Sequence, residues 1–108
     1  MTKEMFEEIT TWQKATFTTA TPHTALNHLT EEIGELDYEI HEGRTFAGHE
    51  EKIKAEFADC FLLLFGAAAL HGLTYEQICE AINSKMEINK QRTWGKPNAE
   101  GYVKHIEP

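Results

Sequence analysis

Residues 54–70 read KAEFADCFLLLFGAAAL, and this stretch decides the fold. Most of it is apolar, yet it begins with two carboxylates, Glu56 and Asp59, spaced three residues apart. Residues three apart are neighbours on a helix, so both acids should project from one side of it. We expect the apolar neighbours to bury Asp59 or nearly bury it. An ionised carboxylate is rarely buried unless it is paired or binds a metal.

A second pair of acids, Glu32 and Glu35, lies upstream in HLTEEIGELDYEI, residues 28–40. Apolar residues recur around them at helical spacing, at Leu26, Leu29, Ile33, Leu36 and Ile40. If the two helices pack as a hairpin, the four carboxylates converge, and their repulsion in a low dielectric requires cations between them. The sequence therefore predicts a divalent-metal site between two helices, formed by Glu32, Glu35, Glu56 and Asp59.

Two simpler interpretations of these acids compete with a metal site. A row of acids on a helix is usually a solvated face, and we interpret Asp37 and Glu42 in this way. For Glu56 and Asp59 the alternative is an interhelical salt bridge. The chain has only 10 Lys and Arg residues, and few of them are near these acids, so a salt bridge is disfavoured.

The remaining sequence extends the helical pattern. Thr21 is a good N-cap and Pro22 suits the first position of a helix. We expect helices over 3–17, 22–41, 47–71 and 74–92, with a connector at 16–22 and a short loop at 44–50. No strand signal is present. The predicted fold is a single all-α domain over 1–108, a four-helix bundle with an irregular C-terminal tail.

Composition excludes several classes of function. A formal charge of −8 disfavours nucleic acid as a partner, because no basic stripe is present to neutralise phosphates. The first ten residues lack the apolar run of a signal peptide, and the longest apolar run falls short of the ~20 residues that span a bilayer. We therefore expect no membrane partner and a cytoplasmic protein, with Cys60 and Cys79 reduced.

The last predicted helix carries cations where apolar residues would be expected. The face that begins with Ile78 and Ile82 continues as Lys85, Asn89 and Arg92. These side chains either extend to water at a helix end or bind phosphate oxygens. Carboxylates that bind metal, placed beside such cations, are typical of phosphoryl chemistry on a nucleotide. Lys52, on the same stripe as Glu56, is a further candidate for phosphate binding.

Aromatic side chains supply candidates for contacts to a base. Trp12 and Phe17 lie near the end of the first predicted helix, Trp94 follows the last one, and His28 lies one turn before Glu32. Aromatic residues at helical spacing are more often part of a core. Both interpretations therefore stay open for Trp12, Phe17, Trp94 and His28.

Taken together, these segments show a resemblance. HLTEEIGEL followed by EFADCFLLL resembles the EExxE…ExxD pattern of the MazG-like all-α nucleoside triphosphate pyrophosphohydrolases. KMEINKQRTWG, residues 85–95, resembles the last helix of that superfamily. WQKATF at 12–17 and the tail pattern WGxPxxxGxxxH are similar to its short dATP/dGTP diphosphohydrolase branch, which is common in phages. The resemblance covers nearly the whole chain.

The resemblance implies an enzyme that hydrolyses a purine (deoxy)nucleoside triphosphate (dGTP, GTP or dATP) to the monophosphate and pyrophosphate. It implies Mg²⁺, or Mn²⁺ in its place, on Glu32, Glu35, Glu56 and Asp59. Glu31 or Glu35 would position or deprotonate the water that attacks the α-phosphorus, and Lys85, Asn89 and Arg92 would hold the phosphates. It further implies a homodimer or homotetramer, in the host cytoplasm if a phage encodes the chain.

Three alternatives remain at this point. The first is a catalytically silent helical module that binds a nucleotide or a protein. The second is an enzyme like phosphoribosyl-ATP pyrophosphohydrolase, which has the same fold. The third is a di-iron carboxylate bundle, which is disfavoured because no Glu-x-x-His occurs in the helical stretches.

Overall fold

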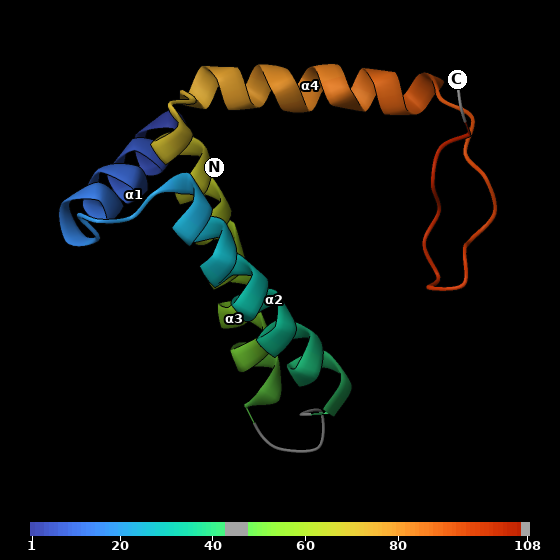
Figure 1. Ribbon diagram of the computed structural model, residues 1–108, viewed down its shortest axis with the longest axis horizontal. Helices are drawn as coiled ribbons and strands as arrows, with labels where there is room; N and C mark the ends of the chain where they lie inside the picture. The colour runs from blue at the N-terminus through green and yellow to red at the C-terminus, as the bar shows by residue number, and fades with distance from the viewer. Residues whose placement is uncertain (43–47, 107–108) are drawn as a thin grey trace. The chain divides into compact units, whose positions relative to one another are not determined.

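The computed structural model describes residues 1–42 and 48–106. Within those ranges it contains four helices and, in place of strands, an isolated antiparallel bridge between Trp94 and His105 (Figure 1). The helices are α1 (Lys3–Thr16), α2 (Pro22–Glu42), α3 (His49–His71) and α4 (Tyr75–Gln91). The all-α class is confirmed, and the described helix ends lie close to the expected ones. Most of the loop expected at 44–50 lies outside the described residues.

The chain divides into two compact units, Met1–Tyr75 and Glu76–Pro108. The first contains α1, α2 and α3, and the second contains nearly all of α4 and the tail. Each unit is described by itself below. The single domain over 1–108 and the packing of α4 into a bundle stay predictions.

The ends of the helices follow from local chemistry. Thr21 caps α2 as expected: its Oγ1 accepts from the Thr24 N–H at 3.1 Å, and Thr24 Oγ1 accepts from the Thr21 N–H at 2.9 Å. Thr2 caps α1 in the same way. Gly72 ends α3 at a φ of 109°, a left-handed conformation that favours glycine.

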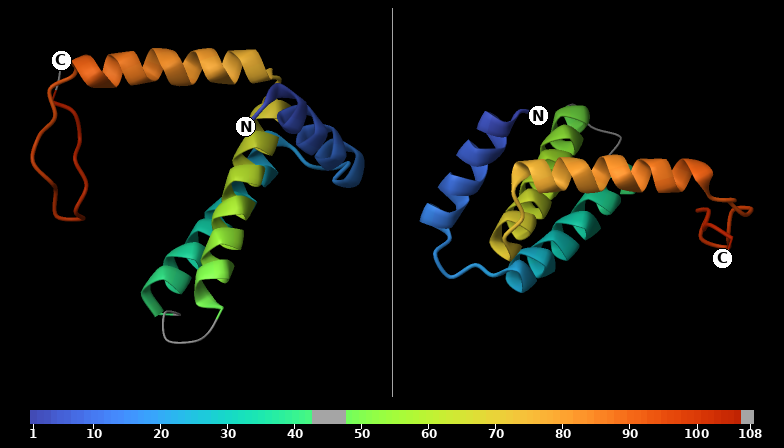
Figure 2. Two further views of the ribbon diagram at one scale, coloured as in Figure 1. Left: turned by 180° about the vertical axis from the view of Figure 1, so that it is seen from behind. Right: turned by 90° about the horizontal axis from the view of Figure 1, so that it is seen from above.

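The core of the first unit lies between α2 and α3, which run side by side as a hairpin (Figure 2). The buried side of α2 carries Ala25, Leu29 and Leu36. On α3 the buried positions Gly66, Ala67 and Ala69 are small, so neighbouring helices approach closely. This close packing fixes how α2 and α3 face each other farther along the hairpin, where the acids lie.

A side-chain hydrogen bond attaches α1 to the same part of α3. Gln13 Nε2 donates to the Leu62 carbonyl oxygen at 2.9 Å. Gly66 makes this approach possible, because a Cβ there would lie 2.7 Å from Gln13 Oε1. Phe6 is buried beside Phe65 and Tyr75, with ring centroids 6.1 and 5.8 Å away. The contact between α1 and α3 therefore consists of a side-chain hydrogen bond and of packing between aromatic rings.

The expected burial of Asp59 on α3 was wrong, because this residue is exposed. Its apolar neighbours do not cover it, and Phe57, Phe61 and Leu64 are themselves 44%, 57% and 49% exposed. In the first unit α3 contacts α2 along the hairpin and α1 near Gly66, which leaves the other sides of its first half uncovered. Composition alone does not show which sides of an apolar helix have neighbours.

The second unit pairs α4 with a tail that folds back on itself. No residue of α4 is buried. In the tail the Gly95 N–H donates to the Lys104 carbonyl at 3.0 Å, and the Ile106 N–H donates to the Thr93 carbonyl at 2.7 Å. The expected irregular tail is thus a hairpin-like loop held by few backbone bonds.

Two further expectations concern the cysteines and membranes. Cys60 and Cys79 are free thiols, as expected. Among residues 1–42 and 48–106, no single helix is long and apolar enough to cross a membrane, and α3 and α4 meet that criterion only when counted together.

Candidate metal centre

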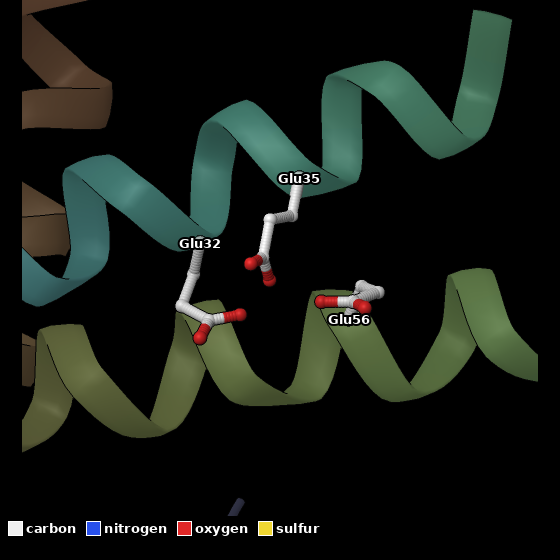
Figure 3. A group of neighbouring side chains, drawn as sticks. All are labelled: Glu32, Glu35 and Glu56. Carbon is white, nitrogen blue, oxygen red and sulfur yellow. The ribbon is translucent and has the colours of Figure 1, made fainter. Parts of the chain in front are cut away.

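Three carboxylates converge between α2 and α3. Glu32 and Glu35 extend from α2 toward α3, where Glu56 lies opposite them (Figure 3). One carboxylate oxygen from each of the three lies within 4.8 Å of the other two. The spacing of three residues on α2 and the close hairpin packing together produce this group.

The environment of the three acids is unfavourable for anions that have no counter-charge. The Glu32 side chain is only 17% exposed. Burial raises the pKa of Glu32, and the charge of Glu35, a hydrogen bond to Glu35 and the charge of Glu56 raise it further. Glu56 Oε2 is buried and has no hydrogen-bond partner. A buried oxygen of this kind needs a partner of some sort.

The alternative of an interhelical salt bridge at these acids is wrong for the part of the chain that the structure describes. No Lys or Arg there forms an ion pair with Glu56 or Asp59. The interhelical ion pair on this side of the hairpin joins Lys52 Nζ to Glu39 Oε1 instead, at 2.8 Å.

The three carboxylates fit a hard divalent cation. Mg²⁺ and Mn²⁺ prefer carboxylate oxygens, and Mg²⁺ commonly uses a few carboxylates together with water and substrate phosphates. Three oxygens within 4.8 Å of one another can surround one ion. Such an ion would supply the missing partner of Glu56 Oε2 and would neutralise the repulsion between Glu32 and Glu35.

Asp59, the fourth predicted ligand, lies outside this group of three. It is exposed, and together with Glu32 it borders a hollow of about 680 Å³. Residues three apart on a helix differ in direction by about 60°, so Asp59 lies on the same broad side of α3 as Glu56 but borders the hollow instead of joining the group of three. The structure therefore brings together three of the four predicted ligands and places the fourth beside Glu32.

The larger hollow lies among α1, α2 and α3 and has aromatic walls. Trp12 and Phe17, with ring centroids 5.5 Å apart and perpendicular planes, both border it. His28 borders it as well, and its Nε2 lies 3.2 Å from Glu32 Oε1. Three of the four base-binding candidates thus share one hollow with Glu32 and Asp59.

A second hollow of about 610 Å³ borders the other side of the acids. Charged residues line much of it, namely Glu31, Glu35, Glu39, Lys52 and Glu56. The carboxylates of Glu39, Glu56 and Glu35 raise the pKa of Lys52, which is therefore a stable cation beside the cluster. The acid cluster lies between an aromatic hollow and a charged one.

Comparison with known proteins now identifies the family. Residues 5–108 match the family model of dATP/dGTP pyrophosphohydrolases. The chain belongs to this family. A solved structure, described as cyanophage S-2L MazG-like pyrophosphohydrolase bound to dGDP and three catalytic Mn²⁺ ions per active site, is similar to it, with 30% identity, a TM-score of 0.74 and 99% of each chain covered. Among curated proteins, none matches this chain.

The chain is thus a MazG-like, phage-type nucleoside triphosphate pyrophosphohydrolase. The resemblance drawn from its acid motifs and tail is confirmed. The family model covers the acids on α2 and α3 and also α4 and the tail. Both compact units of this pyrophosphohydrolase therefore belong to the family pattern.

The phosphate-binding candidates of α4 lie in the second unit of the pyrophosphohydrolase. Lys85 is exposed, whereas Asn89 and Arg92 are half-buried. Arg92 Nη1 lies 3.5 Å from His105 Nδ1. Trp94, the fourth base-binding candidate, donates from Nε1 to the Asn89 carbonyl at 2.9 Å. The tail thus holds the last turn of α4 through Trp94 and His105.

Sequence reasoning missed two buried polar residues of this pyrophosphohydrolase. Glu39 and His49 are only 8% and 6% exposed, and Glu39 Oε2 lies 3.8 Å from His49 Nδ1. Glu39 follows Glu35 by one turn and continues its stripe, which was a usable signal. His49 lies across the loop, so its proximity to Glu39 is visible only in the folded chain.

Proposed function

We propose that this enzyme hydrolyses a purine deoxynucleoside or nucleoside triphosphate, namely dGTP, GTP or dATP, to the monophosphate and pyrophosphate. The observation that carries the proposal is the convergence of three carboxylates between an aromatic hollow and a charged one. The family supports it, and so does the similar cyanophage enzyme, which binds dGDP and Mn²⁺.

We assign the metal to Glu32, Glu35 and Glu56, with Asp59 as a further ligand from the edge of the aromatic hollow. The ion is Mg²⁺ in our proposal, and Mn²⁺ would serve in its place. When bound, such ions offset the phosphate charge and stabilise the charge that develops at the α-phosphorus.

Acidic residues of the chain would orient and deprotonate the attacking water. Glu31 and Glu35 are one turn apart on α2 and both border the charged hollow. One of them would orient the water and accept its proton. The water oxygen forms a bond to the α-phosphorus, and the bond between this phosphorus and the bridging oxygen breaks. Pyrophosphate leaves with that oxygen.

The different linings of the two hollows suggest which end of the nucleotide binds in each. The aromatic hollow, with Trp12, Phe17 and His28, would take the nucleoside, because bases stack on aromatic rings. The triphosphate would then pass the acids toward Lys52 in the charged hollow. Lys85, Asn89 and Arg92 would bind phosphate oxygens, and Trp94 would support the base side.

We further propose that the enzyme works as a homodimer or homotetramer with one catalytic domain per chain. Support comes from large apolar side chains that are exposed when the first unit is taken by itself, among them Ile33 at 51% and Phe61 at 57%. A second copy of the chain is the occupant that we propose for this surface.

The test measures pyrophosphate release from a panel of ribo- and deoxynucleoside triphosphates and phosphoribosyl-ATP, with Mg²⁺, with Mn²⁺ and with EDTA. We expect release from a purine nucleotide that EDTA abolishes. Glu56→Gln should reduce kcat by more than about 100-fold, since even residues outside the ligand shell of a metal cost about 10–100-fold. Glu51→Gln, an exposed acid on α3, is the matched control and should keep wild-type activity.

Two outcomes would contradict the proposal. Full activity in Glu56→Gln would reject the metal centre. A folded wild-type enzyme whose melting temperature rises with nucleotide, but which releases no pyrophosphate, would favour the silent binding module. Preferential use of phosphoribosyl-ATP would favour that alternative substrate.

A further inference from the structure

The ion pair between buried Glu39 and half-exposed Lys52 differs from two other lysine–carboxylate pairs in the described part of the chain. Lys52 Nζ lies 2.8 Å from Glu39 Oε1, and the Glu39 side chain is 11% exposed. By contrast, the pairs Lys54–Glu51 and Lys90–Glu87 join side chains that are all more than 60% exposed. Exposed pairs of that kind contribute little to stability. A carboxylate that has been removed from water beside a half-exposed lysine needs a different explanation.

The buried side chain of His49 lies against the Glu39 carboxylate of this pair. This side chain is 8% exposed, and its Nδ1 lies 3.8 Å from Glu39 Oε2. Glu39 is therefore held between a buried imidazole on one side and the Lys52 ammonium on the other. Since the carboxylate cannot swing out to water, it fixes the end of the flexible lysine side chain, which would otherwise sample many rotamers.

The position of the pair relative to the acid cluster is also informative. Glu39 lies one turn after Glu35 on α2, and Lys52 lies one turn before Glu56 on α3. All four residues border the charged hollow. The fixed ammonium is thus the cation that borders this hollow together with the acids. In the proposed direction of the substrate, this hollow receives the β- and γ-phosphates.

We propose that Glu39 is a positioning residue that holds Lys52 where the leaving pyrophosphate is bound. The inference rests on the proposed function and adds a specific role to it. Lys52 contacts the phosphates beyond the α-phosphorus, and Glu39 acts only through Lys52. Its carboxylate points at the lysine and at His49, so it stays paired when the acids bind metal.

The pair has a competing explanation as a purely structural link that closes the hairpin. A structural link would affect the melting temperature and would reduce all ligand affinities alike. A positioning role affects one product selectively. Inorganic pyrophosphate should lose affinity when the pair is broken, whereas the nucleoside monophosphate, which occupies the aromatic hollow, should not.

The experiment compares wild type, Glu39→Gln, Lys52→Met and the double variant in the metal-loaded enzyme. It measures KM, kcat and the product-inhibition constants of pyrophosphate and the nucleoside monophosphate. We expect each single variant to weaken pyrophosphate inhibition by about 10-fold or more, as removal of supporting residues around metal sites does. The inhibition constant of the monophosphate should change less than about 2-fold.

The double variant separates an action through Lys52 from an independent effect. If Glu39 acts only through Lys52, Glu39→Gln should add nothing in the Lys52→Met background. The matched control is Glu51→Gln with Lys54→Met, an exposed pair on the same helix, which should leave every constant unchanged. Lys52 is 50% exposed, so Lys52→Met tests the pyrophosphate contact even if Glu39→Gln fails to fold.

The contrary results fall into two groups, those that overturn only the positioning role and one that overturns the proposed function as well. Equal losses of pyrophosphate and monophosphate affinity, or additive effects in the double variant, would overturn the positioning role while the hydrolytic function stands. Unchanged pyrophosphate inhibition in Lys52→Met would do the same. A wild-type enzyme that releases no pyrophosphate from any nucleotide would overturn the proposed function and this inference with it.

Discussion

At the scale of single residues, the crowding of Glu32, Glu35 and Glu56 makes a negative charge on Glu32 unfavourable. The Glu32 pKa is raised above its ordinary value of 4.5 by burial and by its neighbours Glu35 and Glu56. The metal-free folded chain therefore binds a proton there more tightly than the unfolded chain does. Its stability falls as pH rises from 4.5 through the raised pKa, and the full cost of the charge is present above that pKa.

Because the raised pKa means that a charged Glu32 destabilises the metal-free fold, we can predict the stability of Glu32→Gln in EDTA. The variant has no charge at this position, so it should melt at a higher temperature than wild type at neutral pH. The difference should shrink as pH falls through the raised pKa and should level off below 4.5, where the Glu32 carboxyl of wild type is mostly protonated in both the folded and the unfolded state. Thermal melts across this pH range, followed by circular dichroism, measure it.

Glu31→Gln, at the exposed neighbouring position, is the control and should show a much smaller pH-dependent difference. Mn²⁺ should reverse the order of wild type and Glu32→Gln, because a ligand at a hundred times its Kd stabilises the folded state by about 2.7 kcal/mol. A Glu32→Gln variant less stable than wild type at every pH in EDTA would show that the cluster is not under electrostatic repulsion.

Three of the four acids could be placed from the sequence, and the fourth could not. Spacing alone placed Glu32 and Glu35 on one side of a helix and Glu56 on a helix that could return to them, and the structure brings these three together. Asp59 lies outside the group because its direction depends on how α3 is rotated against α2. No local pattern specifies that rotation. The Glu39–His49 contact depends on the folded hairpin in the same way.

At the scale of helices, one close contact determines how α1 is attached to the hairpin. Gln13 reaches the Leu62 carbonyl only because Gly66 has no side chain. The aromatic hollow depends on this contact, since Gln13 and Gly66 both border it together with Trp12. The limits of the helices were predictable from caps such as Thr21-Pro22. The α1–α3 contact was not, because it joins side chains that are 49 residues apart.

Gly66→Ala tests this attachment. The new Cβ would lie 2.7 Å from Gln13 Oε1, so the Gln13–Leu62 hydrogen bond should be lost. The atoms that the new Cβ would meet are at the end of the flexible Gln13 side chain, so this side chain should swing aside and relieve the overlap. The lost hydrogen bond costs about 1 kcal/mol and offsets the roughly 1 kcal/mol that alanine gains through helix propensity, so the free energy of unfolding should change little. Urea unfolding measures it.

Gly34→Ala on α2 is the matched control. A Cβ at Gly34 meets no heavy atom within 4 Å, so this substitution should stabilise the enzyme by up to about 1 kcal/mol. Equal stability gains in both variants would show that the Gln13–Leu62 hydrogen bond does not hold α1 in place.

At the scale of the whole molecule, each of the two compact units, taken by itself, buries few large apolar side chains. No large side chain is fully buried among the described residues, and the buried hydrophobic positions are Phe6, Ala25, Leu29, Leu36, Ala67 and Ala69. Of the 108 residues, 41% are hydrophobic. Small domains gain stability by association, and apolar area removed from water contributes about 25 cal/mol per Å². The family resemblance implied association of this kind, which stays a prediction, but it did not specify the surface.

The exposed apolar side chains on α3 provide the test of association. We expect the wild-type enzyme, with a chain mass of 12.3 kDa, to have the mass of a dimer or tetramer by light scattering. Phe61→Glu places a charge on a side chain that is 57% exposed in one chain, and it should shift the enzyme toward monomer. Burial of an unpaired charge in an interface is costly, so a large shift is expected even in a stable assembly.

Met5→Glu on α1 is the control for this substitution, since Met5 is exposed to a similar degree, 52%, away from the hairpin. It should leave the mass unchanged. If Phe61→Glu also keeps the wild-type mass, the surface around Phe61 is not the contact between copies. If both variants dissociate, the contact between copies extends to α1, and the aromatic hollow beside it would then be shaped in part by a neighbouring chain.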